Sequence, residues 1–179
     1  MTIQKSRPWL LEEAREVAED LITLLRPACE RIQVAGSIRR NKARVGDIEL
    51  LAISKVGPAI IHLDARVAEL LAKGILDYRL NKRGARTYGR LNKLLIHAPS
   101  GMPVDLFSTV DKYWGMALVV RTGSREFNIR VMTRFKALGL KGHAYAGVED
   151  LAGPYYDCPT EEDVFRLLQW PYVPPEKRL

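Results

Sequence analysis

The runs VAGSIRR at 34–40 and GDIEL at 46–50 decide the fold of this chain. The second run opens a strand predicted over 47–54. Because side chains i and i+2 of a strand share a face, Asp47 and Glu49 point one way and their apolar neighbours point into the core. Two acids side by side repel each other and lose hydration. A hard cation such as Mg²⁺ removes that cost, so the pattern predicts a cation site; a solvent-facing side of the sheet is the alternative.

The turn before these acids adds a second signal. A short strand predicted over 32–35 ends at Gly36 and Ser37, where a turn offers backbone N–H groups and a hydroxyl to a phosphate. Two arginines follow at once, and arginine binds phosphate oxygens in a fork. The run VDL at 104–106 places Asp105 among apolar neighbours on another predicted strand. Three carboxylates on adjacent strands suit two metal ions about 3.5–4 Å apart, as used in phosphoryl transfer.

Helical and extended patterns alternate along the rest of the chain. Apolar residues recur every three to four positions over 8–25, which predicts a helix with Pro8 in its first turn and Pro27 at its exit. Further helices are predicted over 62–72, 113–120, 126–138 and 163–169, and further strands over 76–81, 91–98 and 102–108. Residues 140–160 are rich in Gly, Tyr and Pro and predict irregular chain. We therefore expect an α+β fold with a boundary near residue 110.

Composition bounds the class of protein. The chain has 179 residues, of which 47% are hydrophobic, so it can bury a core as one domain or two small lobes. No apolar run approaches the roughly 18 residues of a membrane span. The two cysteines, Cys29 and Cys158, lack metal-ligand spacing, and we expect a reducing cytoplasm.

The net charge of +7 is unevenly placed. Residues 78–104 carry basic side chains and no acid, and 121–141 are nearly as one-sided, whereas 12–20 and 149–163 are acidic. Solvated helix faces explain any one such block equally well. Two basic blocks around a carboxylate site favour nucleic acid as the partner, because neutralising phosphates releases counterions.

Taken together, these motifs resemble the nucleotidyltransferase superfamily and, within it, the family X (DNA polymerase beta-like) DNA polymerases. The runs GSIRR at 36–40 and GDIE at 46–49 resemble that family's Gly-Ser-x-Arg-Arg and Gly-Asp-x-Asp, and Asp105 resembles its third acid. The run TGSREFN at 122–128 and the segment 163–178 resemble later motifs of the same family. The resemblance runs in order from about residue 30 to 179.

This resemblance implies a fold and a set of roles. Residues 1–110 would form a palm lobe, with a mixed or antiparallel sheet and helices on one face, and residues 111–179 a small helical lobe that binds nucleotide and DNA. Asp47, Glu49 and Asp105 would be the catalytic carboxylates and would hold two Mg²⁺, with Mn²⁺ as an alternative. Asp105 would lie nearest the primer 3′-hydroxyl. The implied nucleotide-binding residues are Gly36, Ser37, Arg40, Gly46, Gly123 and Asn128. The basic blocks supply the candidate DNA-binding residues Lys82, Arg83, Arg86, Arg90, Arg121, Arg125, Arg130 and Arg134.

Three departures from the family pattern keep other functions open. Glu49 stands where the polymerases usually have Asp, Val120-Arg121 replaces a Tyr-Phe pair, and Met132 replaces an arginine that senses the template. We expect a DNA-directed DNA polymerase that adds dNTPs to a primer 3′-hydroxyl in gap-filling or repair-like synthesis. The alternatives are a template-independent nucleotidyltransferase acting on nucleic-acid ends or a small acceptor, and a non-catalytic nucleic-acid-binding module.

The expected partners are primer-template or gapped DNA and a dNTP, with no membrane, and we expect a monomer. Because the sequence starts just before the segment that resembles the catalytic core, we expect no lyase domain and no DNA-grasping helical domain of the family. That length resembles the minimal polymerases of some viruses and phages. We therefore expect the cytoplasm, of the host cell if the protein is phage-encoded, with the nucleus as an alternative.

Overall fold

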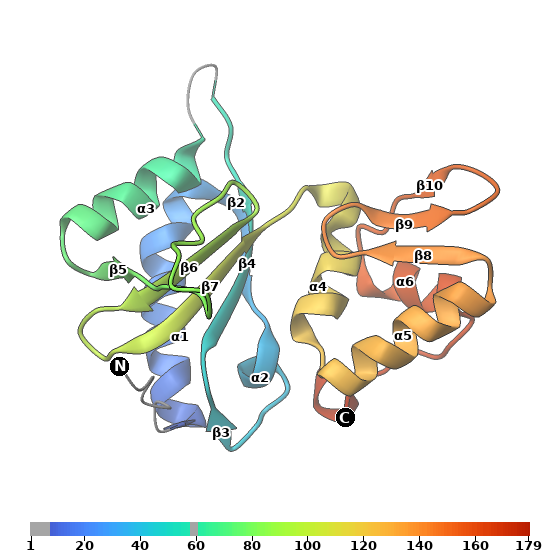
Figure 1. Ribbon diagram of the computed structural model, residues 1–179, viewed down its shortest axis with the longest axis horizontal. Coiled ribbons are helices and arrows are strands. Elements are labelled where there is room, and N and C mark those ends of the chain that lie inside the picture. Colours follow the sequence, from blue (N-terminus) through green and yellow to red (C-terminus); the bar gives the residue numbers. More distant parts are fainter. Residues whose placement is uncertain (1–7, 58–60) are drawn as a thin grey trace.

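Residues 8–57 and 61–179, which the computed structural model describes, form two lobes that lie side by side (Figure 1). The first lobe is built on a five-stranded sheet in the order β2-β4-β7-β6-β5. Its strands are β2 (Cys29–Val34), β4 (Ile48–Ser54), β5 (Leu76–Tyr78), β6 (Asn92–His97) and β7 (Met102–Ser108). The central pair, β4 and β7, is parallel and the other pairs are antiparallel, so the mixed sheet expected from the sequence is confirmed.

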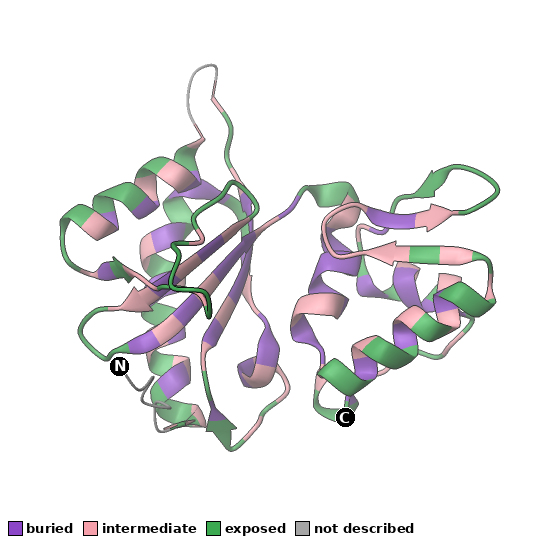
Figure 2. Ribbon diagram, in the orientation of Figure 1, coloured by how far each residue is buried: buried purple, intermediate pink, exposed green. Residues whose placement is uncertain are grey.

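Two helices cover one face of this sheet. The helices α1 (Leu11–Leu25) and α3 (His62–Ala72) present apolar stripes at a spacing of three to four residues. Those stripes pack against the alternate residues Ile48, Leu50 and Ala52 of β4, all fully buried. The buried strands at the centre of the sheet are visible in Figure 2. The opposite face is therefore left to the other half of each strand's residues, which include Glu49.

The N-terminal helix is shorter than its periodicity predicts. We expected Pro8 in its first turn, but α1 begins at Leu11. The reason is local: β1 (Trp9–Leu10) pairs with β3 (Arg44–Val45) in a two-stranded ribbon, which takes these residues out of the helix. After α1, the short turn η1 (Arg26–Ala28) leads into β2.

The second lobe joins three helices to a small sheet. The connection η2 (Asp111–Tyr113) leads into α4 (Trp114–Thr122), followed by α5 (Arg125–Ala137), α6 (Glu161–Leu168) and the terminal turn η3 (Pro175–Lys177). Ser124 caps α5 by accepting a hydrogen bond from the Phe127 N–H at 3.2 Å, and Thr160 caps α6 with Asp163 in a capping box. No helix within the described ranges is long and apolar enough to cross a membrane.

The expectation that residues 140–160 form irregular chain is wrong. The segment predicted as irregular forms a three-stranded antiparallel sheet from β8 (Leu140–His143), β9 (Gly147–Asp150) and β10 (Tyr155–Tyr156). Strands of two to four residues are too short to show a clear alternation of apolar and polar residues, so the many Gly and Tyr residues suggested irregular chain instead. The sheet packs on α5, and Val148 is buried in the core of the lobe.

A third apolar cluster joins the lobes. Leu51, Ile53 and Phe107, on the sheet face that α1 and α3 leave open, pack against Trp114 and Leu118 of α4. The far end of that same face carries the carboxylates. The division at residue 110 stays a prediction, since this cluster belongs to both parts. The fold is nonetheless the α+β class that the sequence predicts, and it places α4 and the start of α5 beside the acidic end of the sheet.

Candidate active site

The three predicted carboxylates lie on one face of the sheet. Asp47 directly precedes β4, Glu49 is its second residue, and Glu49 pairs in register with Asp105 on the parallel strand β7. Each side chain is only partly exposed. Burial, reinforced by the charges of Asp47 and Asp105, raises the pKa of Glu49 to about 8. Burial likewise raises the pKa of Asp105, to about 6, and the pKa of Asp47. This is the electrostatic cost that bound positive charge would relieve.

Arg79 supplies part of that charge. This residue follows β5, and its guanidinium forms an ion pair with the Asp105 carboxylate. Within the described ranges, no group of three His, Cys, Asp or Glu side chains is placed to hold a metal ion. The oxygen donors and their mutual repulsion nevertheless fit a divalent cation. Asp105 would have to exchange Arg79 for that cation, so Arg79 competes with metal for the same carboxylate.

A cavity of about 580 Å³ opens between the lobes beside these acids. The first lobe contributes Arg40 and Glu49 to its wall, and the second contributes the end of α4 and the start of α5, including Gly123 and Asn128. Both lobes must therefore be in place for the cavity to exist. Three of the predicted nucleotide-site residues, Arg40, Gly123 and Asn128, line this single cavity together with one predicted catalytic carboxylate.

The predicted Gly-Ser turn lies behind this cavity. Gly36 opens α2 (Gly36–Arg39) with a φ of +60°, and a Cβ at this position would lie 1.8 Å from Glu49 Oε2. Only glycine lets the turn approach the carboxylate so closely. Among the described residues the buried Ser37 hydroxyl has no hydrogen-bond partner, whereas Gly46 is exposed. Gly36, Ser37 and Gly46 thus adjoin the acids without lining the cavity.

Arg40 reaches across to the second lobe. Its guanidinium donates to the Thr122 carbonyl oxygen, and its Nε is buried with no hydrogen-bond partner among the described residues. It faces Glu49 and Asp47. Gly123 follows at a φ of +65°, and Asn128 donates from Nδ2 to the Val120 carbonyl oxygen at 2.7 Å. Asn128 Oδ1 is buried and unpartnered in the same described part of the chain, so the cavity wall offers unmet polar groups to a ligand.

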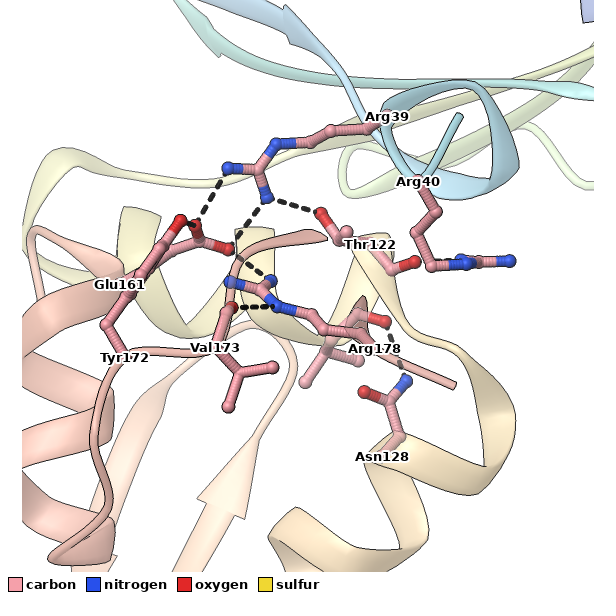
Figure 3. A network of polar contacts seen from close by, with 9 residues as sticks. Arg39, Arg40, Thr122, Asn128, Glu161, Tyr172, Val173 and Arg178 are labelled. Atoms are coloured by element: carbon pink, nitrogen blue, oxygen red, sulfur yellow. Dashed lines mark hydrogen bonds and ion pairs between the residues drawn. The ribbon is translucent and has the colours of Figure 1, made fainter. Parts of the chain in front are cut away.

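A buried network holds the two lobes together next to Arg40 (Figure 3). Arg39 forms two hydrogen bonds of 2.8 Å to the carboxylate of Glu161, on α6, and a third of 2.7 Å to Thr122 Oγ1. Arg178 donates to the same carboxylate at 2.6 Å, and Tyr172 donates to it at 3.1 Å. These hydrogen bonds hold the pKa of Glu161 below its usual range despite burial.

The predicted DNA-binding residues are distributed over both lobes. Lys82, Arg83, Arg86 and Arg90 lie on an exposed loop between β5 and β6, where Arg86 stacks over Tyr78 at 4.3 Å. Arg125 lines the cavity. Arg130 and Arg134, on α5, donate to the carbonyl oxygens of Leu179 and Leu168. Arg121 differs from the rest, because it is partly buried and lines the cavity wall.

Sequence reasoning missed Arg79, Glu161 and Arg178. Arg79 and Arg178 looked like ordinary members of basic stretches, and Glu161 like one acid in an acidic run. Their partners lie 26 residues away for the Arg79–Asp105 pair and 122 for the Arg39–Glu161 pair. A local pattern cannot indicate contacts at such separations. The one signal in the sequence was the capping-box pattern of Thr160 and Asp163, which marks the start of the helix that carries Glu161.

The α+β core therefore places carboxylates on adjacent central strands, beside a cavity that the second lobe helps to line. Residues 117–179 match the family of the DNA polymerase beta thumb. The chain is also 28% identical, over 194 aligned residues, to DNA polymerase lambda of Rattus norvegicus. These two matches support a family X polymerase, and the resemblance predicted from the motifs is confirmed.

The second match spans the two lobes but not the whole relative. It covers 92% of this chain and 32% of the rat protein, so the chain spans about a third of the length of the curated relative that it matches. The family match lies entirely within the second lobe and includes the α4–α5 junction that lines the cavity.

The raised carboxyl pKa values predict that cation binding depends on pH. Asp105 and then Glu49 lose their protons as the pH rises through about 6 and about 8, and only the ionised carboxylates bind a cation well. We expect Mn²⁺ affinity, measured by electron paramagnetic resonance, to rise at least about tenfold between pH 6 and pH 8.5. Glu49→Gln should flatten the upper part of this profile. A wild-type Mn²⁺ affinity that does not change with pH would contradict this link between carboxyl ionisation and cation binding.

Proposed function

We propose that this chain is a DNA polymerase of reduced family X type, which adds a dNTP to a primer 3′-hydroxyl and releases pyrophosphate. The observation that carries the proposal is the cavity between the lobes. It brings an acid of the sheet face, Glu49, together with Arg40 of the Gly-Ser-x-Arg-Arg turn and with Gly123 and Asn128 of the second lobe. These residues come from three separate motifs, and only the fold brings them together.

The protein's contribution is positioning and charge. Arg40 would bind phosphate oxygens through its guanidinium, whose Nε has no hydrogen-bond partner among the described residues, and Ser37 would donate its hydroxyl, which is likewise unpaired there. Asn128, which projects from the first turn of α5, would face the base. Asp47, Glu49 and Asp105 would hold divalent cations, and Mg²⁺ bound there supplies positive charge to the phosphate oxygens.

Asp105 would take the hydroxyl proton. The primer 3′-oxygen forms its bond to the α-phosphorus as the bond from that phosphorus to the pyrophosphate oxygen breaks, and the proton passes to a carboxylate oxygen of Asp105. Arg79, released from Asp105, would be free to pair with a phosphate of the DNA.

A second function is favoured by the cavity lining. Val120, Arg121 and Met132, the positions that depart from the polymerase pattern, all face this cavity. Met132 has no charge or hydrogen-bonding group to read the template side. A template-independent nucleotidyltransferase would use the same acids and arginines with no requirement for a paired base.

Primer extension distinguishes these functions. We expect the chain to extend a primer across a one-nucleotide gap in the presence of Mg²⁺, with the complementary dNTP preferred when each dNTP and rNTP is offered singly. Equal extension of gapped and single-stranded DNA, blind to the template base, would favour the template-independent transferase. DNA binding without any incorporation would favour the non-catalytic module. Gap-filling synthesis in the cytoplasm by a monomer remains part of the proposal.

A further inference from the structure

Arg121 is held in an unusual position at the end of α4. The Cζ atom of its guanidinium lies 3.8 Å from the ring centroid of Phe107 on β7 and 4.6 Å from that of Tyr145, in the turn between β8 and β9. One ring comes from each lobe. Stacking on aromatic faces fixes the plane of a guanidinium and leaves its N–H donors pointing outward within that plane.

Those donors have no partner within the described part of the chain. The side-chain hydrogen bonds and ion pairs of the described ranges include none from Arg121, and its Nε is buried without a partner. Buried polar groups are nearly always paired, and an unpaired one costs free energy. A guanidinium that is stacked, half-buried and unpaired is therefore arranged for an acceptor that is not part of the chain.

The cavity identifies that acceptor. Arg121 lines the same wall as Arg40, and its charge offsets part of the burial that raises the pKa of Glu49 and Asp105, without forming an ion pair with either carboxylate. A ligand group placed among these residues lies next to the acids proposed to hold cations. Phosphate is the group that both cations and arginine bind, the latter through paired N–H donors.

We propose that Arg121 binds a phosphate oxygen of the nucleotide in this cavity, and so belongs to the nucleotide site and not to the basic residues that grip the DNA strand. The inference rests on the proposed function, since it requires a nucleotide in the cavity. The two aromatic rings hold the guanidinium in place before the ligand arrives, which reduces the entropy lost on binding. A family aromatic at this position could stack but could not donate.

Equilibrium binding tests this proposal without relying on turnover. Calorimetric titration in Mg²⁺ would compare dATP, inorganic tripolyphosphate and deoxyadenosine. Arg121→Gln keeps a planar group that can stack but removes the charge, and we expect it to weaken dATP and tripolyphosphate binding about tenfold or more. Deoxyadenosine binding should not change. Arg121→Lys keeps the charge and loses the planar group, so its affinity for dATP should lie between those of the wild type and Arg121→Gln. Lys73→Met, on the exposed end of α3, is the matched loss of one positive charge and should leave dATP binding unchanged.

Three other results would overturn the proposal, each in a distinct way. If both Arg121 variants fold, as thermal unfolding would show, and bind dATP within about twofold of the wild type, Arg121 only packs between the lobes. Weaker binding of dATP and deoxyadenosine, with tripolyphosphate binding unaffected, would mean that Arg121 contacts the nucleoside and not the phosphates. If the wild type binds neither dATP nor tripolyphosphate, the proposed function fails together with this inference. If Arg121→Gln does not fold, Arg121→Lys decides the result alone.

Discussion

Asp47→Ala will lose nucleotide incorporation by about a thousandfold or more while the folded protein becomes slightly more stable. The two effects have one cause. Asp47 is a partly buried acid whose own pKa is raised by burial and whose charge raises the pKa of Glu49. Removing it relieves a repulsion in the resting protein. The same removal deletes a carboxylate proposed to hold the catalytic cations, whose charge stabilisation contributes several kcal/mol to phosphoryl transfer, and about 4 kcal/mol is a factor of a thousand.

Single-turnover extension of a gapped primer and urea denaturation would measure the two effects. Asp20→Ala is the matched control, because Asp20 is an exposed acid on α1, the helix on the other face of the sheet. It should leave both rate and stability close to those of the wild type. Full activity in Asp47→Ala would remove the basis for the polymerase assignment. A loss of activity accompanied by unfolding would show that Asp47 supports the fold instead.

The carboxylate face could be predicted because its signals are local. The strand over 102–108 has the predicted bounds, since a Pro-Ser-Gly turn precedes it and its residues alternate between buried and partly exposed. The pairing of Glu49 with Asp105 follows once both strands are central in one sheet. By contrast, the ion pair of Arg79 with Asp105 depends on where the chain after β5 lies, which no spacing in the sequence specifies.

The cavity itself needed the three-dimensional structure for the same reason. Arg40 and Asn128 are 88 positions apart, and each was predicted from its own motif. Their meeting depends on the angle between the lobes. That angle is set by the apolar cluster around Trp114 and by the buried carboxylate of Glu161. The residues that position the site are therefore harder to predict than the residues that form it.

Glu161→Ala will destabilise the protein by about 3–5 kcal/mol, because it leaves the guanidiniums of Arg39 and Arg178 without their shared partner. Glu161 is 6% exposed and Arg178 is fully buried, so water cannot replace the lost carboxylate without opening the lobe interface. Glu162→Ala, the exposed neighbouring acid on the same helix, should cost less than about 0.5 kcal/mol. Denaturant unfolding of both variants would measure the difference, and equal costs would contradict it.

The pH dependence of this cost follows from the lowered pKa of Glu161. An acid with a depressed pKa stabilises the folded state above the pKa of the unfolded chain, and that stabilisation is lost as the pH falls through the folded value. The difference in the free energy of unfolding between the wild type and Glu161→Ala should therefore be largest at neutral pH and should decrease in acid.

The same substitution should also affect the cavity, because Arg39 is adjacent to Arg40. We expect dATP binding to weaken in Glu161→Ala under conditions where the variant remains folded. Unchanged dATP affinity would mean that Arg40 and the second lobe hold the cavity together without this network.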